Sequence, residues 1–158
     1  LMAICVQTGD MTIYKKTLER KIKEEPKGYT VVNDYRLMAG YYFRMKEYNL
    51  AEEWFEKARN IDAENFHIYS LMAHLKFVRG FRSIAEYYIK TASKKIVNDD
   101  HTYILAMQLA IYQLYNGDVN GSLINIEIAR QISKGDCELC DKLTQGYIKE
   151  VSESRKKE

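Results

Sequence analysis

Small and large apolar side chains recur with helical spacing between Val32 and Asn65. They follow one another at intervals of three and four residues, the spacing at which side chains share one face of a helix. The pattern is interrupted once, between 45 and 48, so it predicts two helices over 32–45 and 48–61 joined by a short turn. The two helices should touch along small residues and interlock through large ones. The residues that carry the pattern are Tyr35, Met38, Ala39, Tyr42, Ala51, Phe55 and Ala58.

The same pattern returns after 34 residues. The second copy consists of Tyr69, Met72, Ala73, Ala85, Ile89 and Ala92, with Gly80 at the turn between its helices. A third copy begins at Tyr103 after three extra loop residues and carries Ala106, Leu109, Ala110, Gly117, Ser122, Ile126 and Ala129. Asn98, Asp99 and Asp100 lie in that loop, where short polar side chains suit the cap of the following helix. Helices are therefore predicted over 66–79, 82–96, 101–116 and 119–133.

The two ends of the chain follow the pattern in part. Upstream, Gly9, Leu18 and Pro26 take the turn, large-residue and proline positions, whereas Tyr14 and Lys21 replace two small residues. Downstream, Cys140, Leu143, Thr144 and Tyr147 match a first helix that no second helix follows. These matches predict a helix over 10–25, a capping helix over 137–154, a helical stub before Gly9, and no strands.

The arrangement resembles the tetratricopeptide repeat family, whose unit places an aromatic residue, Leu, Gly, Tyr, Ala, Phe and Pro at matching intervals. The resemblance extends over about residues 9–150 and is most specific in 32–65; Lys76 and Val97 stand where the family has Tyr and Pro. It implies an all-α fold, a right-handed superhelical solenoid of antiparallel helix pairs. We expect a single domain over 1–158, with a partial repeat (1–28), full repeats at 32–65, 66–99 and 103–136, and a capping helix and tail (137–158).

Small and aromatic residues have structural interpretations in this frame. Alanines at 39, 51, 58, 73, 85, 92, 110 and 129 should let helix backbones approach closely. Of the thirteen tyrosines, we expect Tyr35, Tyr42, Tyr69, Tyr88 and Tyr147 to pack their rings and keep the hydroxyl at an edge.

In this family the first helix of each pair lines an inner groove that commonly holds an extended peptide or a partner helix. Carried over by position, the groove residues are Asn33, Arg36, Gly40, Phe43, Arg44, His67, Ser70, His74, Phe77, Val78, Ile104, Met107, Gln108, Ile111, Leu114 and Tyr115. Members that bind chaperones clamp a terminal carboxylate with Lys and Asn, and Arg36 and Gly40 stand at those positions, so that clamp is absent. Arginines at one end, with Phe77, Met107 and Ile111 at the other, favour an amphipathic segment with an acidic start and an apolar end.

Charge and hydropathy argue against nucleic-acid and membrane partners. The chain has 24 basic and 22 acidic residues, a net charge of +2, which gives no general attraction to phosphates. Its basic cluster of Lys15, Lys16, Arg20, Lys21 and Lys23 is interleaved with glutamates and is interpreted as a solvated helix face. The apolar run Leu1–Val6 is too short to span a bilayer. An RNA-binding helical repeat is therefore the less favoured alternative, and no membrane insertion is expected.

The sequence predicts no catalytic residues, no cofactor and no metal site. His67 and His74 share a helix face, but no carboxylate on that helix would orient them. No phosphate loop or dinucleotide fingerprint is present. Cys137 and Cys140 form a CxxC without a second ligand pair, so we interpret them as small buried apolar residues, with a redox or metal role as the alternative. Three cysteines do not make a disulfide framework, which fits a cytoplasmic protein.

Together these observations predict a non-enzymatic module that binds a protein or peptide ligand and acts as an adaptor, scaffold or co-chaperone. The alternative is a self-associating scaffold, a homo-oligomer, since the apolar residues Ala3, Ile4 and Val6 offer an edge to a second copy. The start at Leu1 suggests either a domain taken from a longer protein or an extra residue before Met2.

Overall fold

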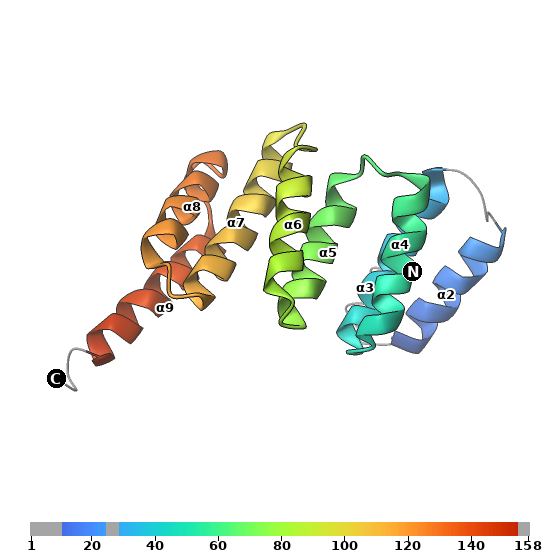
Figure 1. Ribbon diagram of the computed structural model, residues 1–158, viewed down its shortest axis with the longest axis horizontal. Helices are drawn as coiled ribbons and strands as arrows, with labels where there is room; N and C mark the ends of the chain where they lie inside the picture. Colours follow the sequence, from blue (N-terminus) through green and yellow to red (C-terminus); the bar gives the residue numbers. More distant parts are fainter. Residues whose placement is uncertain (1–10, 25–28, 155–158) are drawn as a thin grey trace. The chain divides into compact units, whose positions relative to one another are not determined.

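The structure is a computed structural model that describes residues 11–24 and 29–154, with side chains at 11–24 and 30–146. All regular secondary structure in this part of the chain is α-helical (Figure 1). The helices are α2 (Met11–Glu24), α3 (Tyr29–Arg44), α4 (Tyr48–Ile61), α5 (Phe66–Val78), α6 (Arg82–Ser93), α7 (Asp99–Tyr115), α8 (Val119–Ile132) and α9 (Glu138–Ser154). The predicted stub before Gly9, Pro26 and the edge at Ala3, Ile4 and Val6 lie outside the described residues.

The chain divides between Thr91 and Ala92 into two compact units. In the first, α3 packs along α4, while α2 contacts α3 and α4 contacts α5. In the second, α7 packs along α8, and α8 contacts α9. The pairs α3/α4 and α7/α8 are two of the three full helix pairs that the sequence pattern predicts.

The helix bounds agree closely with those expected from the sequence, and two of them shift for physical reasons. α4 spans the predicted 48–61, whereas α3 begins at Tyr29 rather than 32. The earlier start adds Val31 to the helix, and Val31, like Val32, is buried. α6 ends at Ser93 rather than 96, and a turn follows in which the Lys95 N–H donates to the Ala92 carbonyl.

Polar caps and left-handed turns set where helices begin and end. The Asn98 side chain accepts a hydrogen bond from the His101 N–H, which confirms the cap expected before α7. Asp99 and Asp100, expected in the loop with Asn98, instead form the first turn of α7. Gly80 and Gly117 adopt φ of +81° and +80° at the turns of their pairs. At the equivalent turn after α3 the chain has Lys46, with φ of +62° and a side chain that disfavours this conformation.

The alanines predicted to lie between helices are buried. Every one of the eight named alanines is at most 1% exposed. Tyr69 and Tyr88 are buried, with ring centroids 6.3 Å apart, and Tyr35 and Tyr42 are half-buried. The Tyr147 side chain lies outside the described residues.

The two large replacements on α2 have structural explanations. Tyr14, at a position where the pattern has a small residue, is buried with Leu18 against Met38 of α3. Lys21 reaches across to Asp34 of α3, with Nζ 3.3 Å from the carboxylate. α2 therefore contacts α3 through bulky and charged side chains rather than through small ones.

Candidate functional site

The groove residues expected on α3 are arranged along one side of that helix. The Arg36 guanidinium donates to the Asn33 side-chain oxygen over 2.8 Å, which orients the arginine along the helix surface. A methyl group added at Gly40 would meet nothing within 4 Å, so the space beside this turn of α3 is open. Phe43 lies one turn further on, and its ring contacts Tyr48 at the start of α4.

An aromatic contact joins α3 to α5. The rings of Phe43 and His74 lie 5.3 Å apart between centroids, at an interplanar angle of 46°. His67, His74 and Phe77 are half-buried and share one side of α5 at intervals of seven and three residues. We call the surface formed by Arg36, Gly40, Phe43, His74 and Phe77 the α3/α5 face. Ser70, also expected in the groove, is buried, so it contributes no exposed surface.

The helices that form the α3/α5 face provide no exposed carboxylate. α5 contains no Asp or Glu, and Asp34, the acidic residue of α3, is buried and paired with Lys21. Arg36 and the exposed Arg44 supply positive charge on α3. Burial raises the pKa of Tyr14 on α2, and the charges of Arg44 and Arg36 oppose that rise, so both lie near α2.

Burial also decides the charge state of His74. Desolvation lowers the pKa of its imidazole below the ordinary value of 6.5, because the charged form loses hydration against the packed helices. At neutral pH, His74 is therefore neutral and presents an aromatic ring rather than a cation.

The expected residues of α7 belong to the second compact unit. Ile104, Gln108 and Leu114 are half-buried, and Ile111 and Tyr115 are exposed. Met107 is buried and packs in a core with Ala106, Ala110, Ile126, Ala129, Cys137 and Cys140. A ligand would not reach Met107, because it is buried in this core, with its sulfur 3.8 Å from the Cys140 sulfur.

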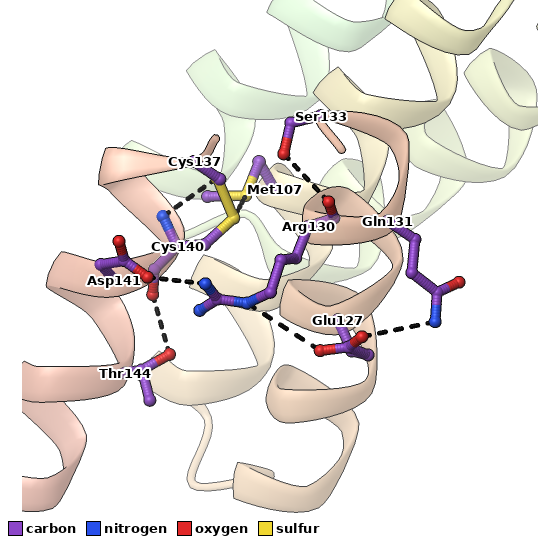
Figure 2. Close-up of polar contacts among 9 residues, drawn as sticks. All are labelled: Met107, Glu127, Arg130, Gln131, Ser133, Cys137, Cys140, Asp141 and Thr144. Carbon is purple, nitrogen blue, oxygen red and sulfur yellow. Dashed lines mark hydrogen bonds and ion pairs between the residues drawn. A yellow bond between two sulfur atoms is a disulfide. The ribbon is translucent and has the colours of Figure 1, made fainter. Parts of the chain in front are cut away.

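Two features were not anticipated from the sequence. A disulfide joins Cys137 and Cys140, with the sulfurs 2.02 Å apart (Figure 2). Their burial was expected, but the bond was not, because the spacing alone does not distinguish a free pair from a bridged one. The second feature is an ion cluster in which Glu52 of α4 pairs with both Lys76 and Arg79. The sequence feature that could have indicated this ion cluster is Lys76, a charged residue at a position where the repeat has Tyr.

A hollow over α4 gives no second site. Its volume is about 510 Å³, it is wide open, and all its lining residues come from that one helix: Asn49, Glu52, Glu53, Glu56, Lys57 and Asn60. Glu52 makes ion pairs with Lys76 and Arg79, and Glu56 with Arg59, so most of the acidic charge of the hollow is neutralised within the protein.

Within the described residues, no three His, Cys, Asp or Glu side chains gather in a metal-binding arrangement. None of the helices in residues 11–24 and 29–154 combines the length and apolar character needed to cross a bilayer.

No family model and no curated protein matches the chain. Among solved structures, it is similar to MamA of AMB-1 in a P212121 crystal form, a tetratricopeptide-repeat protein. The two superpose with a TM-score of 0.53 over 87% of this chain and 72% of MamA, at 18% identity. A likeness at this identity establishes the fold alone. The described part of the chain is thus all-helical and has the tetratricopeptide-repeat fold.

Proposed function

We propose that the protein binds a partner protein through the α3/α5 face and has no catalytic activity of its own. The observation that carries this proposal is the contact between Phe43 and His74, which joins two helices into one surface beside Arg36. A helical-repeat fold of this kind suggests an interaction or scaffold module, and the α3/α5 face has the mixed character that such modules use for binding.

The chemistry of the face selects a class of ligand. Arg36 can bind a carboxylate through two parallel hydrogen bonds, and no exposed carboxylate of α3 or α5 competes for it. Phe43, neutral His74 and Phe77 provide aromatic surface for an apolar side chain. The ligand is therefore a segment that begins with acidic residues and continues with apolar ones. The open space at Gly40 gives its backbone room to approach α3.

The role that follows is that of an adaptor, scaffold or co-chaperone, which we place in the cytoplasm. Gly40 stands where a clamp for a terminal carboxylate needs an amide side chain, so the ligand is an internal segment rather than a chain end. Self-association through the N-terminal edge is a separate hypothesis, and light scattering at high concentration tests it: a strict monomer would exclude it.

A peptide panel tests the proposed ligand class. Fluorescein-labelled peptides with an acidic first half and an apolar second half should bind in an anisotropy titration. Peptides in which the first half is basic and the second half is the same should not bind. Arg36→Glu should weaken binding about tenfold or more, because it removes one charge-assisted contact and adds repulsion. Phe77→Asp should weaken it independently, with circular dichroism to check that the helices remain folded.

The matched control is Arg20→Glu, which makes the same charge change on an exposed residue of α2. It should leave the affinity within about twofold of wild type, apart from the long-range charge effect that salt screens. Equal affinities for wild type and Arg36→Glu would rule out the α3/α5 face as the binding surface.

A further inference from the structure

We propose that Cys137 and Cys140 form a reversible thiol–disulfide exchange site whose redox state controls the docking of the first turn of α9. The co-reactant is a dithiol, either a small molecule or a dithiol protein, that exchanges two electrons with the pair. This inference concerns the second unit and is independent of ligand binding at the α3/α5 face.

The pair is placed where a helix end stabilises a thiolate. Cys137 immediately precedes α9, and Cys140 lies in its first turn. The backbone N–H of Cys140 donates to the Cys137 sulfur over 3.2 Å (Figure 2). N–H groups at a helix start carry partial positive charge, so the thiolate form of Cys137 is favoured over that of Cys140.

The same two sulfurs join α9 to α7. The Cys140 sulfur lies 3.8 Å from the sulfur of Met107, and the Tyr103 hydroxyl lies 3.5 Å from the Cys137 sulfur. Both cysteines are buried in the core that α7 and α8 provide through Ala106, Met107, Ala110, Ile126 and Ala129. Two free thiols need more space than a bonded pair, because non-bonded sulfurs cannot approach as closely. A packed core tolerates added volume poorly, so reduction should push the first turn of α9 away from α7.

The short span of the bridge favours an exchange role over a purely structural one. The cysteines are three residues apart, so the bond closes a very small loop. A bridge of this span removes less unfolded-chain entropy than one that joins distant segments. Its main effect is local, on one helix end. A metal-binding role is less well supported, because no third His, Cys, Asp or Glu ligand accompanies the pair among the described residues.

The exchange can be written with its atoms and electrons balanced. A thiolate of the reductant attacks the Cys137 sulfur, since Cys137 is the less deeply buried of the two cysteines, and the disulfide breaks. The electron pair goes to the Cys140 sulfur, which takes up a proton. The second thiolate of the reductant then attacks the reductant's first sulfur, which is bonded to Cys137 in the mixed disulfide. Cys137 leaves as a thiolate next to the Cys140 N–H and is then protonated. Two electrons and two protons reach the protein, the dithiol becomes a disulfide, and oxidation follows the reverse path.

A second anchor limits the change to the helix start. Arg130 of α8 makes an ion pair with Asp141, with Nη1 and Oδ1 2.7 Å apart, and it also lies 3.9 Å from Glu127 (Figure 2). The Thr144 hydroxyl donates to the Cys140 carbonyl and supports the next turn. These contacts do not involve sulfur, so α9 should remain helical after reduction while its first turn opens more often.

The test uses the full chain with Cys5→Ser, so that every thiol counted belongs to the pair. The protein is equilibrated with reduced and oxidised dithiothreitol at graded ratios, and thiols are counted by alkylation and intact mass. We expect both thiols to appear together as the ratio rises. Backbone hydrogen exchange in residues 137–144 should then be about fivefold or more faster in the reduced form, with α4 unchanged. Unchanged exchange in α9, or a pair that never forms the bond, would overturn the proposal.

Single variants test the roles of the two sulfurs. At neutral pH, Cys137 in the Cys140→Ser protein should be alkylated about tenfold or more faster than Cys140 in the Cys137→Ser protein. Equal rates would overturn the assignment of Cys137 as the exchanging sulfur. The double variant Cys137→Ala/Cys140→Ala is the control, and its hydrogen exchange should not respond to dithiothreitol. Should a variant not fold, the exchange measurement on the Cys5→Ser protein still decides the proposal.

Discussion

The ammonium group of Lys76, buried on α5, makes an ion pair with the carboxylate of Glu52 on α4. The guanidinium of Arg79 binds the other oxygen of the same carboxylate over 2.8 Å. The ring of Phe81 lies 5.6 Å from the Lys76 nitrogen and 5.2 Å from the Arg79 guanidinium carbon. Lys76 thus replaces the aromatic residue of the repeat with a charge, and the preceding helix supplies the partner that makes this replacement tolerable.

Glu52→Gln should reduce the free energy of unfolding by about 1–3 kcal/mol, because it leaves two cations without their carboxylate, one of them buried. Chemical denaturation measures this loss. Glu53→Gln, an exposed change on the same helix, is the matched control and should cost less than about 0.5 kcal/mol. Equal losses in the two variants would show that the ion cluster contributes no stability.

Ala51→Leu should destabilise the protein by about 1–3 kcal/mol. Ala51 is fully buried on α4, the helix that packs along α3, so added methyl groups must displace packed neighbours. The exposed Ala63 offers the same substitution without crowding, and Ala63→Leu should change stability by less than about 0.5 kcal/mol. Thermal unfolding of both variants compares them. A neutral Ala51→Leu would mean that the helix contact is looser than the structure indicates.

Lys46→Gly should stabilise the protein by about 0.5–1 kcal/mol. Lys46 adopts φ of +62°, a conformation that a side chain disfavours and glycine adopts freely, as Gly80 does at the equivalent turn. The gain in the folded state is partly offset by the greater freedom of glycine in the unfolded chain. Gly80→Lys is the reciprocal change and should be destabilising. Urea denaturation of both variants checks the signs, and a destabilising Lys46→Gly would contradict the strained turn.

The stability of the protein should depend on pH through His74. Burial lowers the pKa of His74 in the folded protein below the ordinary value of 6.5, so below that pH the unfolded chain binds a proton more readily. The free energy of unfolding should therefore decrease as the pH falls from about 6.5 towards the pKa of His74 in the folded protein. Above pH 6.5, His74 causes no such decrease. His74→Gln cannot titrate, so its stability should fall less than that of wild type between pH 7.5 and pH 5.5. Parallel losses in the two proteins, measured by urea denaturation, would show that His74 does not drive the effect.

The amino-acid sequence by itself determined the helices, the pairing of α3 with α4 and of α7 with α8, and the identity of the buried small residues. These features depend on local order: Asn98 caps the next helix through its own side chain, and a period of 34 residues returns each alanine to the same face. The resemblance to a tetratricopeptide repeat followed from the same periodicity, and the solved structure of MamA agrees with it at the level of fold.

Tertiary structure decided what each side chain meets. Met107 occupies a groove position in the repeat, yet it is buried in a core formed with α8 and the two cysteines at the start of α9. The partner of Lys76 lies 24 residues earlier, on another helix, and nothing in the local pattern selects Glu52 over the neighbouring glutamates. Cys137 and Cys140 were recognisable as buried, but their spacing does not distinguish two free thiols from the disulfide that the folded protein contains. A periodic pattern specifies which face of a helix is covered, whereas the covering residue is chosen by contacts between segments far apart in the chain.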